Sequence, residues 1–201
     1  MNFADSFLMP QATPDPRPLY REALAWTTGL IAGVRRDQLA APTPCPEFDV
    51  RTLLGHLVAG VERVRIIGEG GDPSTSPTVV TGISDDGYGA AYRSATDRVW
   101  PAWTDGRLDA DVTAPWGTVP GRVAIWVYSM ETLVHGWDLA TATGQPAETR
   151  PELAESVLAA VRHAIPPERR GEKMPFGPVI TPSAHAGPTE KLANWSGRAS
   201  S

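Results

Sequence analysis

The stretch PGRVAIWVYSMETLVHGWDLATATG, residues 120–144, decides how this chain folds. Apolar side chains recur along it at the spacing of a helix, and Gly144 behind them is a natural helix stop. The pattern is formed by Val123, Trp126, Val127, Met130, Val134, Trp137 and Leu139. The stretch therefore predicts a helix over residues 120–142, the most strongly patterned of the chain.

Helical spacing predicts the other long elements as well. They are expected at residues 19–34, 50–67, 86–103 and 151–164, with a short helical turn around residues 188–195. Asp49 is a good N-cap for the second helix, because its carboxylate can accept a hydrogen bond from the first turn. The segment RLDADVTAPWGTVPG looks extended, with a turn near Trp116 and Gly117. Since alternating strand patterns are almost absent, we expect an all-α fold.

The length of 201 residues suits one well-buried domain. The first eighteen residues hold four prolines and little periodicity, so residues 1–18 are interpreted as a flexible leader. Residues 19–165 form the expected bundle, in which a short extended segment precedes the fourth helix. Residues 166–201 are rich in proline and glycine and are expected to pack on the bundle as a C-terminal tail.

Composition excludes several classes of function. The net charge is −5 and no cluster of Lys and Arg is evident, so we expect no nucleic-acid partner. No run of eighteen apolar residues exists and the N-terminus does not resemble a signal peptide, so we expect no membrane partner and a cytoplasmic location. Cys45 is the single cysteine, which excludes an internal disulfide and a cysteine-rich zinc site.

Three residues carry the strongest chemical signal. Glu131 and His135 are four apart, so on a helix they share one face about one turn apart. His56 lies at the edge of the apolar face of the second helix. Such a pair is often an ordinary surface or core contact, but two imidazoles and one carboxylate also form the ligand set of an open catalytic metal site. The sequence thus favours a metal-dependent enzyme.

Two motifs resemble a known group of proteins. PTPCPEFDVRTLLGHLVAGVERV (residues 42–64) and METLVHGWDLATATGQP (residues 130–146) are similar to the two signature blocks of the DinB-like, mycothiol-dependent maleylpyruvate isomerase superfamily. PWGTVPG and the tail TEKLANWSGRAS also resemble its short actinobacterial members, described as metal-binding proteins. The resemblance extends from about Leu19 to Arg198 and implies a DinB-like four-helix bundle.

The resemblance also implies a chemistry. In that family a metal ion, usually zinc, is bound by residues that fall here on His56, Glu131 and His135. The family's cosubstrate is mycothiol, a low-molecular-weight thiol that the metal would activate. The isomerases carry a second, C-terminal domain, whereas about thirty-five residues follow the fifth helix here. An S-transferase acting on an electrophilic small molecule therefore fits better than the isomerase reaction.

Alternatives stay open at this point. The sequence is also compatible with a thiol-independent lyase, cyclase or hydrolase of specialised metabolism, and with a non-catalytic metal-binding module. Either a monomer or a homodimer is compatible with the sequence.

Five further residues are candidates near the site. Asp138 lies one turn after His135 and is predicted to orient a ligand imidazole or to bind substrate. Arg63, Trp116 and Arg122 are predicted to line the substrate pocket, although a solvated surface role is the plainer interpretation. Cys45 precedes the second helix and is either a nucleophile or a small buried apolar residue.

Overall fold

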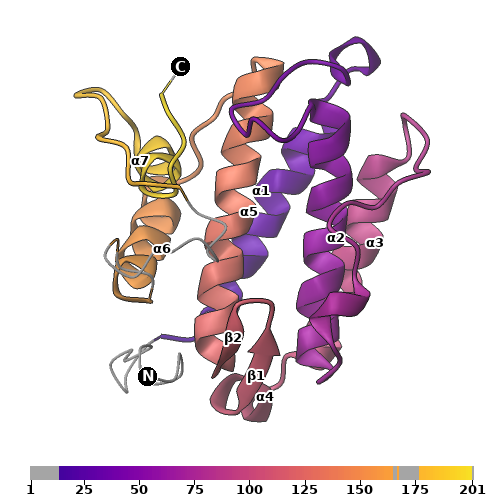
Figure 1. Cartoon of the computed structure of the whole chain (residues 1–201), viewed down its shortest axis with the longest axis vertical. Helices are drawn as coiled ribbons and strands as arrows, with labels where there is room; N and C mark the ends of the chain where they lie inside the picture. The colour runs from indigo at the N-terminus through magenta and orange to yellow at the C-terminus, as the bar shows by residue number, and fades with distance from the viewer. Residues whose placement is uncertain (1–13, 165–166, 168–176, 201) are drawn as a thin grey trace.

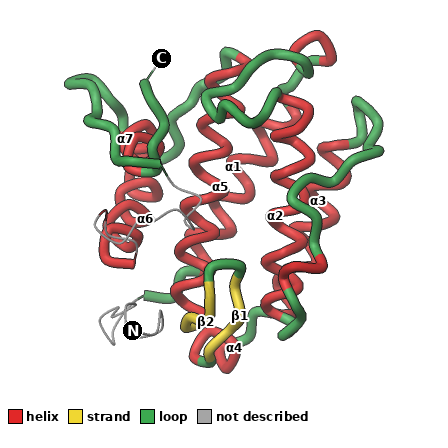
Figure 2. The backbone as a smooth tube through the Cα atoms, viewed as in Figure 1, coloured by secondary structure: helices red, strands yellow, loops and turns green. Residues whose placement is uncertain are grey.

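The computed structural model of the protein describes residues 14–164, 167 and 177–200. The fold is predominantly helical (Figures 1 and 2). Most of the expected leader, residues 1–13, and residues 165–166, 168–176 and 201 of the expected tail lie outside the described residues.

The helices lie close to their predicted positions. They are α1 (Arg17–Ala32), α2 (Val50–Gly68), α3 (Tyr88–Val99), α4 (Asp105–Asp109), α5 (Gly121–Thr143), α6 (Pro151–Ala164) and α7 (Pro188–Trp195). Short 3-10 turns occupy Arg36–Gln38, Pro73–Thr75 and Trp100–Ala102. The predicted cap of α2 is confirmed, since Asp49 accepts a hydrogen bond of 2.8 Å from the Thr52 amide.

Some predicted boundaries were wrong for local reasons. Helix α1 begins at Arg17, earlier than predicted, with a proline in its first turn. A proline is tolerated there because the N–H groups of the first turn have no hydrogen-bond partner within the helix, so nothing is lost when one is missing. Helix α3 ends at Val99, where Pro101 takes part in a 3-10 turn that replaces the last predicted helical turn.

The extended segment before α5 is a β-hairpin, so the fold is not purely helical. Strands β1 (Asp111–Ala114) and β2 (Gly117–Pro120) pair antiparallel, with Ala114 opposite Gly117 and the turn at Pro115 and Trp116 as predicted. The short helix α4 in front of the hairpin was not predicted. At the bottom of Figure 1 the hairpin packs beside the first turns of α5.

Helix α5 runs through the middle of the molecule (Figure 1) and packs against α1, α2, α6 and α7. Helix α3 completes the other side by contacting α1 and α2. As a result α5 is buried on nearly all sides, and its polar residues Ser129, Thr132 and Asp138 are buried with it. A polar side chain on this helix therefore needs a partner inside the protein.

The described part of the tail lies against the bundle. Helix α7 packs on α5 and α6, and the Ile180 amide donates to the Asn194 carbonyl, which ties the segment before α7 to its last turn. Among the described residues, none of the helices combines the length and the apolar character that a bilayer span requires.

Candidate metal centre

The three residues singled out from the sequence meet between α2 and α5. His56 comes from α2, and Glu131 and His135 come from successive turns of α5. The Oε1 atom of Glu131 lies 3.4 Å from His56 Nε2 and 3.6 Å from His135 Nε2. The two imidazoles are buried, whereas the Glu131 side chain keeps 28% of its surface exposed. One carboxylate oxygen thus faces two ring nitrogens and open space.

These separations suit ligands around one metal ion. They are longer than most hydrogen bonds between nitrogen and oxygen, which are about 2.7–3.2 Å. Tetrahedral zinc with bonds of about 2.0–2.2 Å separates its ligand atoms by about 3.3–3.6 Å. The donor atoms of all three residues lie within 4.8 Å of one another. The residues present therefore fit a zinc-type centre in donor chemistry and in spacing.

A backbone carbonyl orients the His56 ring. His56 Nδ1 lies 2.9 Å from the Thr78 carbonyl oxygen, so Nδ1 donates to that carbonyl and Nε2 is turned toward Glu131. The carbonyl comes from the loop between α2 and α3, which is held by a 3.1 Å hydrogen bond from the Val80 amide to the Gly55 carbonyl. Only glycine permits this approach, because a Cβ on Gly55 would lie 2.4 Å from the Val80 oxygen.

A buried carboxylate orients the His135 ring. His135 Nδ1 lies 3.0 Å from Oδ2 of Asp138, a residue with no exposed surface. Asp138 also pairs with Arg198, whose Nε donates to both carboxylate oxygens at 3.2 Å, and the Cys45 sulfur lies within 4.8 Å of the carboxylate. Asp138 lies behind His135 and lines neither of the cavities described below. It is therefore placed to orient the imidazole rather than to touch a substrate.

Charges in this cluster stabilise one another. Burial on its own raises the pKa of Glu131, but hydrogen bonds to His135 and His56 outweigh it and hold that pKa well below its usual range. Burial lowers the pKa of His135, but the bonds to Asp138 and Glu131 prevail and raise it to about 9. In the metal-free protein at neutral pH, the cluster is thus a carboxylate beside an imidazolium.

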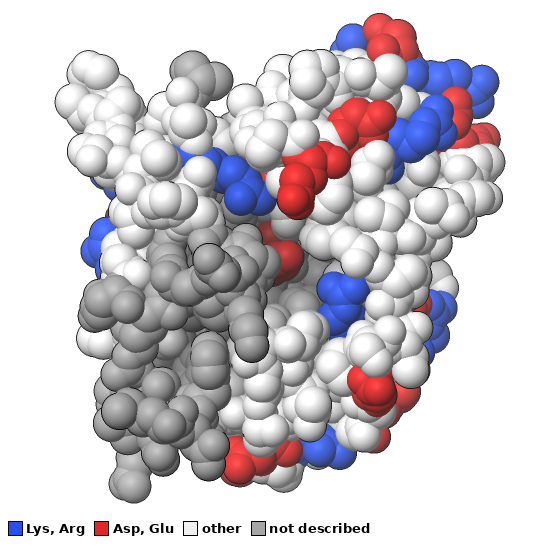
Figure 3. Space-filling view, viewed as in Figure 1, with Lys and Arg blue, Asp and Glu red and all other residues white. Residues whose placement is uncertain are grey.

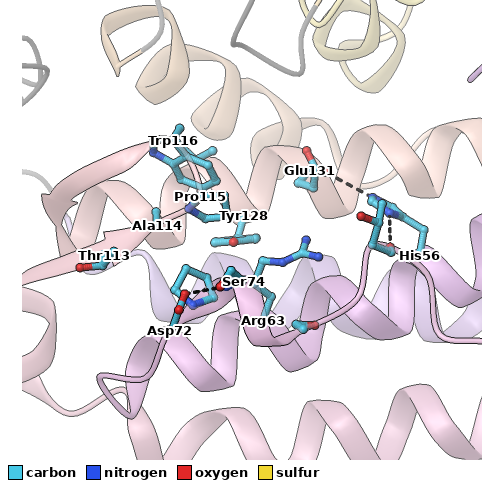
Figure 4. A pocket seen from close by; sticks show the side chains of 14 residues that line it. His56, Arg63, Asp72, Ser74, Thr113, Ala114, Pro115, Trp116, Tyr128 and Glu131 are labelled. Carbon is cyan, nitrogen blue, oxygen red and sulfur yellow. Dashed lines mark hydrogen bonds and ion pairs between the residues drawn. The ribbon is translucent and has the colours of Figure 1, made fainter.

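A cavity of about 600 Å³ opens on one side of Glu131, and we call it the aromatic cavity (Figure 4). Trp116 and Tyr128 line it with their rings 5.4 Å apart, and Arg63 and His56 face it from α2. Arg63 donates to the Pro77 carbonyl at 2.9 Å. Among the described residues, the buried Tyr128 hydroxyl has no hydrogen-bond partner. Aromatic and polar side chains therefore line this space together.

A second cavity of about 410 Å³, the cysteine cavity, reaches the same carboxylate from the other side. It is lined by Cys45, Phe48, His135 and Arg198 among others, and shares His56, Thr78 and Glu131 with the aromatic cavity. Phe48 packs on the His56 ring at 4.8 Å. Figure 3 shows a recess on this face between α5 and α2, with acidic and basic atoms at its margin. The candidate centre thus lies where two cavities meet.

Burial decides between the two interpretations of Cys45. The residue is 6% exposed, and its burial raises the pKa of the thiol. A nucleophilic cysteine needs a lowered pKa and access. The structure therefore favours the small buried apolar residue.

Arg63 and Trp116 line the aromatic cavity, but Arg122 does not reach it. Arg122 forms an ion pair of 2.8 Å with Asp109 and lines neither cavity. The unpredicted helix α4 brings Asp109 beside the first turn of α5, which holds the arginine away from the site. The structure therefore brings Arg63 and Trp116 together at this cavity and places Arg122 outside it.

Four residues of the site were missed from the sequence. Thr78 acts through its backbone, for which side-chain patterns give no signal. Phe48 and Tyr128 look like ordinary apolar positions, and Arg198 lies sixty residues beyond Asp138. Their roles depend on tertiary contacts that spacing alone does not reveal.

The fold and the site together define a helical protein with two histidines and a glutamate at the junction of two cavities. The chain belongs to the mycothiol maleylpyruvate isomerase N-terminal domain family, whose model matches residues 20–140. Two uncharacterized Mycobacterium tuberculosis proteins, MT0763 of strain CDC 1551 / Oshkosh and Rv0738 of strain ATCC 25618 / H37Rv, are each 36% identical to it over 185 residues. The alignment covers 92% of this chain and 98% of each of theirs.

A solved structure supports the same fold. The crystal structure of the mycothiol-dependent maleylpyruvate isomerase matches with a TM-score of 0.57 at 16% identity, covering 73% of this chain and 68% of that one. A histidine-to-alanine mutant of that enzyme matches equally well. At this identity the match shows the shared fold.

Proposed function

We propose that this chain is a metal-dependent enzyme that uses mycothiol to act on an electrophilic small molecule. The proposed metal, zinc before other divalent ions, binds His56, Glu131 and His135. The observation that carries the proposal is the approach of two oriented imidazoles to one carboxylate oxygen, at 3.4 and 3.6 Å, where two cavities meet. Membership of the mycothiol isomerase family supports the choice of thiol.

The ligand set suits thiol activation. A divalent ion held by one carboxylate and two neutral imidazoles keeps a net charge of about +1, which favours a thiolate over a thiol at neutral pH. Thr78 and Asp138 keep the proton of each ring on Nδ1, so both Nε2 atoms present a lone pair. The protein's part is to hold these donors and to shield them from bulk water.

The aromatic cavity is the proposed binding place of the electrophile. Trp116 and Tyr128 supply a surface for a planar or apolar body, and Arg63 supplies a cation beside Glu131. The cysteine cavity would then admit the thiol from the opposite side. In an S-transferase reaction by substitution, the sulfur would form a bond to the electrophilic carbon while the bond from that carbon to its leaving group breaks. The leaving group would depart with the electron pair of that bond, and the thiol proton would go to solvent.

We also propose a finer description of the fold. Helices α1, α2, α3 and α5 contact one another in a ring, with α1 on α5, α5 on α2, α2 on α3 and α3 on α1. This arrangement supports the four-helix bundle of DinB-like proteins, with α6, α7 and the hairpin as additions to it.

Metal analysis of the purified protein tests the proposal first. We expect about one zinc per chain in the wild type and loss of zinc and thiol-dependent turnover in His135→Ala. Arg150→Gln is the matched control, because it removes a charge that pairs with Glu22 on the surface, away from both cavities. Full turnover by metal-free protein would refute the metal site. Turnover that persists without mycothiol would refute the thiol step and favour Lewis-acid chemistry.

A further inference from the structure

The C-terminal segment reaches the candidate metal centre through one side chain. Arg198 extends from the residues after α7 to Asp138 on α5, where its Nε lies 3.2 Å from both carboxylate oxygens. The arginine side chain is 13% exposed and the aspartate side chain has no exposed surface. A contact across sixty residues of sequence thus ends next to a proposed ligand, His135.

Backbone geometry and hydrogen bonds hold the segment around Arg198 independently of its side chain. Gly197 adopts φ +92°, a left-handed conformation that turns the chain sharply after α7. The Arg198 amide then donates to the Ala193 carbonyl at 3.0 Å. The Asn194 side chain donates to the Arg198 carbonyl at 2.9 Å. These bonds hold the Arg198 backbone beside the last turn of α7, and from there its side chain reaches Asp138 on α5.

Asp138 requires this partner on energetic grounds. A buried carboxylate costs several kcal/mol unless cations and hydrogen bonds compensate it. Asp138 has two such neighbours, the Nδ1 of His135 and the Nε of Arg198. Among the described residues, the guanidinium of Arg198 is the permanently charged cation that bonds to this carboxylate.

We propose that Arg198 is a positioning residue of the metal centre, acting through Asp138. The guanidinium holds the Asp138 carboxylate in place through two hydrogen bonds, and that carboxylate accepts from Nδ1 of His135, so that Nε2 points at the metal position beside Glu131. The centre is therefore incomplete without residues 177–200. This inference rests on the metal site proposed above and adds the C-terminal segment to it.

Zinc affinity measured by chelator competition tests the positioning role. Arg198→Gln, which keeps polarity but removes the charge, should bind zinc about 10–100-fold more weakly, as is usual when an outer partner of a ligand histidine is lost. Arg198→Lys should recover part of the affinity. Arg150→Gln, which removes a surface ion pair at the start of α6, should bind as the wild type does.

A double-mutant cycle separates positioning from a general loss of stability. If Arg198 acts through Asp138, Arg198→Gln should weaken zinc binding in the wild-type background and have little further effect in Asp138→Asn. Additive losses in the double variant would overturn the proposal. So would wild-type zinc affinity in Arg198→Gln.

A second measurement does not depend on the metal. In zinc-free protein the Nδ1 proton of His135 is buried and hydrogen-bonded to Asp138, so it should give a downfield proton resonance that exchanges slowly with solvent. The resonance should vanish in Arg198→Gln and persist in Arg150→Gln. If the wild type binds no zinc, the proposed function fails and this resonance still tests Arg198. An unchanged resonance in Arg198→Gln would overturn the positioning role alone. Should Arg198→Gln fail to fold, Arg198→Met, which keeps the apolar stem but removes the charge, takes its place, and wild-type zinc affinity with an unchanged resonance would then refute the role.

Discussion

Replacing Gly55 by alanine should damage the candidate centre without touching any proposed ligand. The added Cβ would lie 2.4 Å from the Val80 carbonyl oxygen and 2.8 Å from Val79 Cγ1. Neither separation is tolerated, so the loop between α2 and α3 must move outward. That movement withdraws the Thr78 carbonyl, which lies 2.9 Å from His56 Nδ1.

Two magnitudes follow from this geometry. Forced repacking of a tight contact costs about 1–3 kcal/mol of unfolding free energy. Loss of the carbonyl that orients a ligand histidine weakens metal binding by about 10–100-fold. Urea unfolding of the zinc-free protein measures the first quantity, and chelator competition measures the second.

Gly60 provides the matched control on the same helix. A Cβ there meets nothing within 4 Å, so Gly60→Ala only improves helix propensity, by about 0.5–1 kcal/mol, and leaves zinc affinity unchanged. If Gly55→Ala binds zinc as tightly as Gly60→Ala does, the loop carbonyl does not orient His56 and the reasoning is refuted.

Three other perturbations have defined outcomes. In zinc-free protein the pKa of His135 is raised to about 9, above its unfolded value of about 6.5, so the stabilisation by protonated His135 is full below pH 6.5 and is lost as pH rises through 9. Over that pH range, the unfolding free energy of the wild type relative to His135→Gln, measured in urea, should fall by an amount on the order of 3 kcal/mol. A difference that does not change with pH would contradict this assignment. Asp49→Ala removes the cap of α2 and should lower the unfolding free energy by about 1 kcal/mol, measured in urea, whereas an unchanged value would mean that the cap bond contributes nothing. Cys45 should react with a maleimide at least about tenfold more slowly in native than in urea-unfolded protein, because its thiol is buried with a raised pKa; equal rates would show that it is accessible.

The long helices could be predicted because each carries its own local signals. Asp49 and Gly144 bound two of them, and apolar spacing defines their length. The amphipathic face predicted for residues 120–142 was too narrow, however, because α5 is surrounded by four other helices and buries its polar residues as well. Sequence spacing shows which residues repeat, not how many neighbours a helix receives.

Site residues could likewise be predicted where helix spacing brings them together, and could not where tertiary contacts do. Glu131 and His135 share a helix, so their closeness follows from a four-residue spacing, and the same spacing argument reaches Asp138. The approach of His56 follows from the packing of α2 on α5, which the sequence indicated only through the apolar face that carries it. Arg198 and the Thr78 carbonyl come from connecting segments, whose paths are set by contacts such as the one at Gly55.

The burial of α5 on nearly all sides also has a consequence for hydrogen exchange around the site. Amides of a fully enclosed helix exchange with solvent only in global unfolding, whereas amides of an exposed loop exchange through small local openings. Glu131 and His135 lie on this largely buried helix, whereas Thr78 lies on an exposed loop. Hydrogen exchange should show the loop between α2 and α3, which supplies the Thr78 carbonyl to His56, opening on a much shorter timescale than α5.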